Sequence, residues 1–531
     1  MTTDETAPNT AGPTSRDAWW AGVLGAAFAL AFGELLALNS SIISLVLGIG
    51  SVIVENTPGD LIASSINNLG SLQKPLLLGG ITVASLLVGG SLGRAGRTNP
   101  MIVLSGFTFF GIVGGLATAR DPLADAAGSW AVALSAAALG AAITLVILQM
   151  ARRPETATIT PGTPMTQVAD RRRFLAFSGA AVGTAAVFAG SKLGGTSAAE
   201  RARDEVIANR ALTTTTSTTT PVVERVVFDS LEGMSPVITP ISPKDEFYLI
   251  DTAFPRPKVD PANWSLTIGG PYAERELTFT YDDLLARDHV TREVTLSCVS
   301  NPVGGDLVDN AIWKGVPLTE LLEEAGVDPT ANTQIFSRSV DGWTCGFPTP
   351  LAYDGRTALL ALEMNDEPLP LIHGFPARLV IAGLYGYVSA TKWIESIEVT
   401  DWEGVDGFWM PRGWSKEGPV KTQSRIDVPR HDAKIVAGPM TFGGVAWAPA
   451  IGIERVDVLF DQAGDWQQAE LAEAETNESW VQWKLDWDAT PGEHIVQVRA
   501  TDKAGTTQSP IPVNPAPNGA EGWHTIRVNV T

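Results

Sequence analysis

The chain is poor in cysteine and in positive charge, and each shortage excludes a class of protein. Only two cysteines, Cys298 and Cys345, occur in 531 residues. This excludes a disulfide-rich scaffold and the multi-cysteine zinc and iron–sulfur proteins. The net charge of −21 argues against a nucleic-acid partner, because such a protein needs a basic surface to meet phosphates.

Histidine is scarce as well, and its placement excludes one further kind of site. The five histidines are His289, His373, His431, His494 and His524. None lies in the apolar N-terminal region, so helices there cannot give two histidine ligands to a haem iron. We therefore expect no haem in the chain.

Long apolar runs, by contrast, are abundant near the N-terminus. They cover residues 19–38, 75–92, 101–119, 130–150 and 174–193. Each run approaches or reaches the roughly 20 residues with which a helix crosses about 30 Å of hydrocarbon. A shorter apolar stretch, residues 41–54, either extends the first helix or forms a re-entrant piece. We predict a five-helix transmembrane bundle within residues 1–195.

The arginines between these runs predict the orientation of the bundle. Arg94 and Arg97 lie between the second and third runs, and residues 152–153 and 171–173 lie between the fourth and fifth. Arginine-rich loops stay in the cytoplasm. Five spans with a cytoplasmic N-terminus therefore place everything after about residue 195 outside the membrane.

The segment from Arg171 to Leu175 reads Arg-Arg-Arg-Phe-Leu and precedes the fifth apolar run. It resembles a twin-arginine export signal, which carries domains that fold before export. A cytoplasmic anchor for the fifth helix explains the same arginines equally well. Under either interpretation we expect a multi-pass protein of a bacterial cell membrane.

The remainder of the chain predicts a linker and two domains. Residues 196–221 contain a threonine run that cannot build a core, so we predict a flexible linker. Residues 222–424 mix alternating strands with short helices, such as residues 317–325 before Gly326, and predict an α+β domain. Residues 425–531 carry short alternating strands between Gly, Pro and Asp turns, a pattern typical of an immunoglobulin-like β-sandwich.

Cys298 follows a β-rich run and precedes Asn301, Pro302, Gly304 and Gly305. A thiol at such a strand-to-loop transition is held rigidly beside a pocket, and a soft thiolate suits a soft or high-valent metal. Two other interpretations stay open. A lone cysteine is most often a small buried hydrophobe, and a disulfide to Cys345 is compatible with an oxidising compartment.

A second cluster combines cationic groups with glycine-rich backbone. His373 and Arg378 are five residues apart, and Lys392 follows fourteen residues later, with Gly383 and Gly386 between them. Such a combination suits a buried phosphate group. A surface loop with solvated charges is the competing interpretation.

Together these motifs resemble a known family. In order they are Cys298 with Asn301, the run Trp-Lys-Gly-Val-Pro-Leu at 313–318, Asp341-Gly342, residues 373–378, and Lys392-Trp393. This set is similar to the molybdopterin domain of the sulfite oxidase superfamily, in particular to its membrane-anchored, sulfite-oxidase-like branch of actinobacteria. The similarity covers about residues 247–531, because the β-rich tail resembles the immunoglobulin-like dimerisation domain of that family.

The resemblance implies a molybdenum–molybdopterin cofactor, with Cys298 as the metal ligand and catalytic residue. The further cofactor contacts that it implies are Tyr248, Ser339, His373, Arg378, Ser389, Thr391 and Lys392. It implies an oxidoreductase that transfers an oxygen atom to or from a small-molecule substrate. It also implies a homodimer through the C-terminal domain. With no haem in the chain, a separate protein must carry the electrons.

The sequence departs from sulfite oxidases around the substrate. The residues that stand where the family has arginine, histidine or tyrosine are Val303, Ile250, Thr252 and Trp414. An anion such as sulfite needs fixed positive charge to offset desolvation, so these departures favour a neutral or unusual substrate. Arg338, Arg412 and Lys416 are either replacements for this charge or ordinary surface charges. A sulfoxide reductase and a non-enzymatic cell-surface binding module on the same scaffold remain alternatives.

Overall fold

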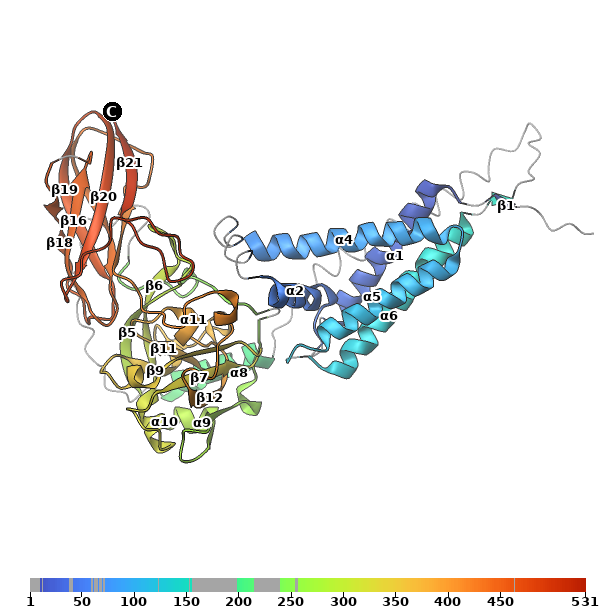
Figure 1. Cartoon of the computed structure of the whole chain (residues 1–531), viewed down its shortest axis with the longest axis horizontal. Helices are drawn as coiled ribbons and strands as arrows, with labels where there is room; N and C mark the ends of the chain where they lie inside the picture. The colour runs from blue at the N-terminus through green and yellow to red at the C-terminus, as the bar shows by residue number, and fades with distance from the viewer. Residues whose placement is uncertain are drawn as a thin grey trace, which may run out of the picture. The chain divides into compact units, whose positions relative to one another are not determined.

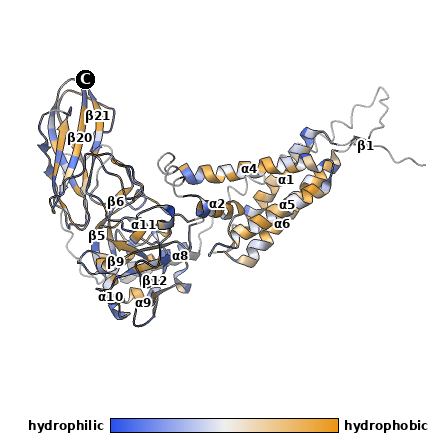
Figure 2. Ribbon diagram, in the orientation of Figure 1, coloured by the Kyte–Doolittle hydropathy of each residue, from blue (hydrophilic) through white to orange (hydrophobic). Residues whose placement is uncertain are grey.

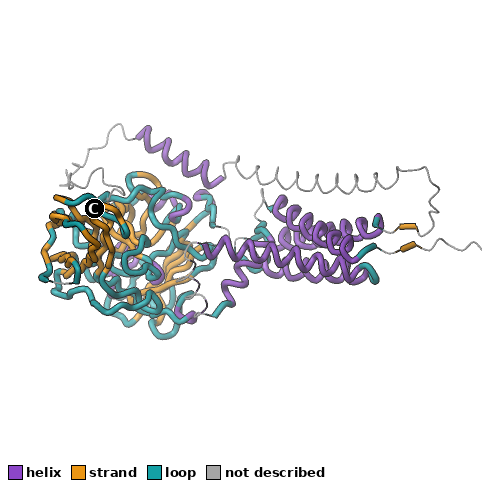
Figure 3. The backbone as a smooth tube through the Cα atoms, turned by 90° about the horizontal axis from the view of Figure 1, so that it is seen from above, coloured by secondary structure: helices purple, strands orange, loops and turns teal. Residues whose placement is uncertain are grey.

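The described part of the chain divides into two compact units, each treated separately below (Figure 1). The computed structural model describes residues 10–11, 13–37, 42–58, 61, 65, 69, 72–122, 124–151, 153–154, 198–213, 239–253, 256–462 and 464–531. The first unit holds the N-terminal helices, and the second holds nearly everything from residue 197 onward. In Figure 3 the first unit consists mainly of helices, whereas the second unit contains most of the strands.

Among the described residues, four helices are long and apolar enough to cross a membrane. They are α1 (Ser15–Leu36), α4 (Gln73–Gly96), α5 (Pro100–Thr118) and α6 (Ala126–Met150). Hydrophobic residues recur along the length of these helices (Figure 2). Four of the five predicted apolar helices are therefore confirmed. The fifth run, residues 174–193, and the arginines at 171–173 lie outside the described residues.

The short apolar stretch does not extend the first helix. It forms a separate 12-residue helix, α2 (Leu45–Asn56), whose N-terminus is capped by Ser44. The side chain of Ser44 also donates a hydrogen bond to Glu34 near the end of α1. The polar contact at this corner satisfies groups that would otherwise cost free energy in an apolar setting.

Glycine allows the helices of the bundle to pack closely. A Cβ atom at Gly22 of α1 would overlap with the backbone of Gly89 in α4, and one at Gly93 would overlap with the carbonyl of Ala18. Gly25 of α1 faces Gly140 and Thr144 of α6 in the same way. Small residues at helix contacts are typical of membrane bundles, because close backbone packing replaces the hydrophobic driving force there.

The first domain of the second unit contains two sheets, one antiparallel and one mixed. In one, the strand order is β10–β9–β6–β5, and β11 pairs with β9. Its strands are β5 (Val290–Ser297), β6 (Val308–Pro317), β9 (Ala358–Met364), β10 (Glu367–Pro368) and β11 (Arg378–Ile381). Every residue of β9 and of β11 is buried, so this sheet forms the centre of the core.

The other sheet has the order β4–β3–β12–β7–β8, in which β3 and β12 are parallel. Its strands are β3 (Ser265–Gly269), β4 (Leu277–Thr280), β7 (Thr333–Ser339), β8 (Thr344–Pro348) and β12 (Ile394–Asp401). Short helices connect the strands, namely α9 (Tyr281–Leu285), α10 (Leu318–Glu324) and α11 (Gly386–Ser389). This mixture is the α+β arrangement expected from the sequence.

The C-terminal residues form a β-sandwich. One sheet has the order β13–β15–β19–β18 and the other has the order β14–β21–β20–β16–β17. The strands are β13 (Gln423–Val428), β14 (Ala433–Ile435), β15 (Gly438–Trp447), β16 (Ile453–Phe460), β17 (Gln467–Gln468), β18 (Glu470–Leu471), β19 (Val481–Ala489), β20 (Gly492–Asp502) and β21 (His524–Val530). Phe442, Trp483 and Val498 are fully buried in its core.

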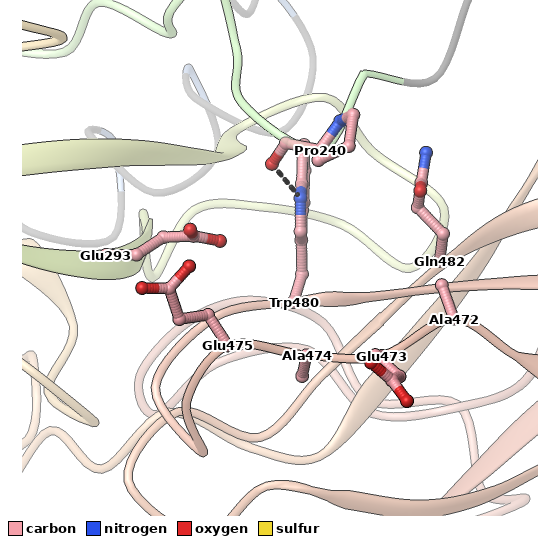
Figure 4. Close-up of a pocket in the computed structure, with 8 residues that line it drawn as sticks. All are labelled: Pro240, Glu293, Ala472, Glu473, Ala474, Glu475, Trp480 and Gln482. Carbon is pink, nitrogen blue, oxygen red and sulfur yellow. Dashed lines mark hydrogen bonds between the residues drawn. The ribbon is translucent and has the colours of Figure 1, made fainter. Parts of the chain in front are cut away.

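The two domains of the second unit share a polar junction. The amide of Thr295 donates to the carbonyl of Glu478 at 3.0 Å, and the Thr295 hydroxyl accepts from the amide of Trp480 at 2.7 Å. A small pocket lies beside this junction, where Glu293 and Glu475 face each other and the Trp480 indole donates to Pro240 (Figure 4). The strand that leads to Cys298 is therefore bonded to both domains.

The predicted linker contains a helix, α8 (Ala198–Thr213), which docks on the first domain. The Arg203 guanidinium donates to the carbonyls of Leu369 and Pro368 at 2.9 and 3.1 Å. Val206 packs against the core of that domain. A flexible tether was expected over all of residues 196–221, but the side chain of Arg203 gives the first part of this segment a fixed position. Residues 214–221 lie outside the described part.

Candidate active site

Cys298 stands immediately after β5, at the start of a loop that the C-terminal domain supports. Both cysteines are free thiols, so the alternative of a disulfide is not what the structure contains. Cys298 is 8% exposed, and its sulfur accepts one hydrogen bond, from the amide of Ser300 at 3.4 Å. Burial raises the pKa of the Cys298 thiol. A metal ion bound to the sulfur would reverse this, because a coordinating thiol loses its proton.

The loop after Cys298 is fixed by contacts with the sandwich. The Asn301 side chain accepts from the amide of Leu307 at 3.0 Å and closes the loop on itself. Arg425 of β13 donates to the carbonyl of Gly305 at 2.8 Å. A Cβ atom at Gly304, whose φ is +75°, would overlap with the ring of His524. The thiol is therefore held by two domains.

Tyr248 lies close to both Cys298 and Arg378. Burial raises the pKa of the Tyr248 phenol above its usual range, Cys298 raises it further, and Arg378 opposes this effect. Asp309 fixes the segment from Ser242 to Tyr248. Its carboxylate accepts hydrogen bonds from the amide of Tyr248 at 2.7 Å and from the hydroxyl of Ser242 at 2.6 Å. Burial raises the pKa of Asp309 to about 6.

Two of the cationic groups gather around one short turn, the 3₁₀ helix Leu371–His373. Arg378 donates to the carbonyl of His373 at 3.2 Å and lies 4.9 Å above the ring of Trp313. Lys392 donates to the carbonyl of Ile372 at 3.2 Å. Gly374 follows the turn with a φ of +114°, and a Cβ atom there would lie 3.1 Å from the Lys392 backbone. The turn and the two cations form one compact cradle.

Burial controls the charges of this cradle. It lowers the pKa of His373 to about 4, so this ring is neutral at pH 7, and its Nε2 lies 3.0 Å from the carbonyl of Lys244. Burial also lowers the pKa of Arg378 to about 10 and that of Lys392 to about 8. Both remain mostly cationic at neutral pH. Such a pair of buried cations suits an anionic ligand.

The three hydroxyl residues predicted for the site lie on neighbouring elements. Ser389 donates to the carbonyl of Tyr385 at 3.1 Å, and Thr391 contacts the hydroxyl of Ser337 at 2.7 Å. Ser339, at the end of β7, is 2% exposed, and its hydroxyl has no hydrogen-bond partner. Such a buried polar atom is costly unless something else satisfies it.

The residues of this site fit the requirements of a molybdopterin cofactor. The thiolate of Cys298 would be the protein ligand of the metal. Arg378 and Lys392 would bind the phosphate group. Ser339, the last residue of β7, would offer the cofactor a hydroxyl that has no other hydrogen-bond partner in the described part of the chain. When bound, the cofactor supplies the two-electron chemistry, whereas the protein supplies binding and orientation.

The structure adds three residues that were not among the predicted cofactor contacts. Tyr385 is 4% exposed, its hydroxyl accepts from the amide of Lys421 at 3.5 Å, and its pKa is raised to about 12 by burial, with Cys298 adding to the shift. Asp309 and Asp251 hold Tyr248 and Lys392 respectively. Tyr385 stands directly before Gly386, so its place in the glycine-rich motif was a usable signal. The two aspartates gave none.

The candidate replacement cations have partners of their own. Lys416 donates to the carbonyl of Val405 and to Asp406, both at 2.9 Å. Arg412 lies 3.7 Å above the ring of Phe408 and donates to its carbonyl. Arg338 lies on β7, where it lowers the pKa of Glu395 against the effect of burial.

Of the four positions that depart from the family, three are apolar and the fourth, Thr252, is uncharged. Trp414 is 6% exposed and packs against Tyr387 at 5.8 Å between ring centroids, whereas Ile250 is 49% exposed. Val303 faces Gly522 of the C-terminal domain. None of these side chains supplies the charge that an anionic substrate requires.

Comparison with known proteins matches two stretches of the chain to two domain families. Residues 253–409 match the oxidoreductase molybdopterin binding domain, and residues 417–530 match the Mo-co oxidoreductase dimerisation domain. An uncharacterized oxidoreductase of Bacillus subtilis, YuiH, is 33% identical over 159 residues, which are 30% of this chain and 76% of that protein. The chain belongs to the sulfite oxidase family of molybdopterin oxidoreductases. Its first domain thus marks it as an enzyme that uses a molybdopterin cofactor.

Other members of the sulfite oxidase family match over longer segments. The mitochondrial sulfite oxidases of Drosophila melanogaster and Homo sapiens are each 29% identical to this chain, over 49% and 52% of its length. The chain spans 52% and 59% of those two proteins. Among solved structures, the sulfane dehydrogenase SoxCD from Paracoccus pantotrophus aligns with a TM-score of 0.45 and 25% identity, over 51% of this chain and 76% of that chain.

Proposed function

We propose that this chain is a membrane-anchored molybdenum oxidoreductase that transfers an oxygen atom to or from a small neutral substrate. Cys298 is the metal ligand in this proposal. The observation that carries it is the joint presence of a buried free thiol and a cationic cradle in a domain of the molybdopterin family. In the oxidative direction the substrate gains an oxygen atom from water, and two protons and two electrons leave. A separate carrier protein takes the electrons.

A neutral substrate is supported by the charges around the thiol. Arg338, Arg412 and Lys416 each lie among other partners, and Val303 and Ile250 carry no charge. On the side of Tyr385 the carboxylate of Glu521 is paired with the ammonium group of Lys421, so this pair supplies no unpaired positive charge for an anion. The Tyr385 hydroxyl is a donor that would bind the oxygen atom of a sulfoxide or an N-oxide. In the reductive direction such a substrate gives up its oxygen atom as water, with two protons and with two electrons that enter from the carrier.

The rest of the molecule has supporting roles in this proposal. The apolar helices anchor the enzyme, and the second unit lies outside the cell membrane. The C-terminal domain forms a homodimer, as the description of its family suggests. A protease added to intact spheroplasts should then cleave the second unit. Light scattering on the detergent-solubilised chain should give the mass of a dimer.

The test of the function uses the full chain, produced with a supply of cofactor and purified in detergent. We expect about one molybdenum atom per chain, as measured by elemental analysis. A redox-dye assay should then show reduction of sulfoxides or N-oxides that exceeds oxidation of sulfite. Cys298→Ser is the matched inactive control. A chain without stoichiometric molybdenum would falsify the proposal, and a clear preference for sulfite would overturn the neutral substrate.

A further inference from the structure

The three carbonyl groups of the turn Leu371–His373 all accept hydrogen bonds from the predicted phosphate-binding region. The indole of Trp393 donates to Leu371 at 2.7 Å, Lys392 donates to Ile372 at 3.2 Å, and Arg378 donates to His373 at 3.2 Å. The donors of this cradle are thus oriented by backbone acceptors. The cradle keeps its shape through contacts within the chain.

Lys392 has a second, stronger partner. Its ammonium group donates to Oδ2 of Asp251 at 2.8 Å, and the same oxygen accepts from Arg256 at 2.9 Å. The side chains of Lys392 and Asp251 are 9% and 4% exposed, whereas that of Arg256 is 40% exposed. A buried ammonium group is costly without an anion, so Asp251 offsets the cost of burying Lys392.

A carboxylate and a phosphate present the same kind of acceptor to an ammonium group, namely a charged oxygen. Asp251 therefore has the chemistry of the ligand that the cradle is expected to bind. Arg256 lies on the exposed side of this carboxylate and would keep hold of it if Lys392 released it. An exchange of partners at Lys392 then leaves no buried charge without a counter-ion.

We propose that Asp251 is an internal anion at the phosphate position of the cofactor site, and that cofactor binding replaces its carboxylate by a phosphate oxygen at Lys392. The identity of the phosphate as that of the pterin rests on the proposed function. The competition itself rests on the geometry of Asp251, Lys392 and Arg256. Asp251 thereby weakens the affinity of the site for phosphate and stabilises the cofactor-free enzyme.

The first test measures binding of inorganic phosphate to the full chain, produced without cofactor and purified in detergent. Asp251→Asn should bind phosphate about tenfold more tightly than the wild type by titration calorimetry, because one charge-assisted competitor is removed. Asp245→Asn is the matched control, since it makes the same charge change in the same segment at an exposed position. An affinity of Asp251→Asn equal to or below that of the wild type would overturn the proposal.

A second measurement decides the question if Asp251→Asn folds poorly without cofactor. Asp251→Asn should lower the melting temperature of the cofactor-free enzyme more than that of the loaded enzyme, in which phosphate accompanies Lys392. The loaded variant should retain its pterin, detected by fluorescence after gel filtration, at least as well as the wild type. Faster loss of pterin would contradict the exchange. If the wild type takes up no pterin at all, the proposed function fails, whereas the phosphate titration still decides the role of Asp251.

Discussion

At the scale of single residues, buried carboxylates hold the groups that face the cofactor site. Asp309 accepts two hydrogen bonds that fix the segment before Tyr248, and Asp251 accompanies Lys392. Neither aspartate has to touch a substrate to affect the reaction. Their effect is to position a phenol and an ammonium group inside a protein interior, where unpaired polar groups are costly.

The titration of Asp309 gives a prediction for stability. Its pKa of about 6 in the folded protein lies above the value of roughly 3.9 in an unfolded chain. The stability that protonated Asp309 contributes is therefore complete below about pH 4 and is lost as the pH rises through about 6. Asn cannot titrate, so Asp309→Asn should remove up to about 2 kcal/mol of this pH dependence.

The measurement is thermal denaturation of the second unit within the full chain, between pH 4 and pH 7. The melting temperature of the wild type should fall with rising pH relative to that of Asp309→Asn. Asp245→Asn, an exposed change of the same charge, serves as the control. Parallel pH profiles for the wild type and Asp309→Asn would show that the carboxylate of Asp309 is not the titrating group.

The sequence predicted which residues belong to the site, but it did not predict which other side chains hold them in place. Motif order pointed to Cys298, His373, Arg378 and Lys392, and the structure brings Cys298 near Tyr248 and gathers the other three around one turn. Asp251 could not be predicted in this way, because it lies 141 positions before Lys392. Contacts between such distant positions depend on how the strands and loops are arranged in space.

At the scale of secondary structure, the packing of the apolar helices depends on where glycine faces a neighbour. Gly93 and Gly79 both lie in α4, but they have different surroundings. A Cβ atom at Gly93 would overlap with the backbone of α1, whereas one at Gly79 meets no atom within 4 Å. The same substitution should therefore have opposite effects at the two positions.

Gly93→Ala should destabilise the bundle by about 1–3 kcal/mol, because a backbone cannot move aside as easily as a side chain. Gly79→Ala should leave stability unchanged or raise it by about 0.5–1 kcal/mol, since alanine is the better helix former. Thermal denaturation in detergent, followed by the loss of helical circular dichroism, compares the two variants. Equal melting temperatures would contradict the close contact between α1 and α4.

Element boundaries show where reasoning from sequence was sufficient. Long apolar runs predicted α1, α4, α5 and α6 to within a few residues, because length and hydropathy are properties of the run itself. Alternation likewise predicted strands in both domains of the second unit, and β3 and β16 are among those that formed. Helix α8 was missed, because its sequence is polar and its position depends on Arg203 reaching the carbonyls of Pro368 and Leu369 at the end of β10.

At the scale of the whole second unit, the C-terminal domain is part of the candidate site. Arg425 and His524 of the sandwich pack on the loop that follows Cys298, and Gly519 lies against the hydroxyl of Tyr385. The order of the domains was predictable from strand patterns and motifs. The junction was not, because it consists of backbone hydrogen bonds and a glycine contact that leave no periodic pattern.

The central claim is that the sulfur of Cys298 is bonded to molybdenum, and X-ray absorption at the molybdenum edge tests it directly. The full chain would be compared with Cys298→Ser and with Cys345→Ser, the other buried thiol. The account predicts that Cys298→Ser removes one sulfur neighbour of the metal, whereas Cys345→Ser leaves the spectrum unchanged. An identical sulfur shell in the wild type and Cys298→Ser, with the metal still bound, would contradict it.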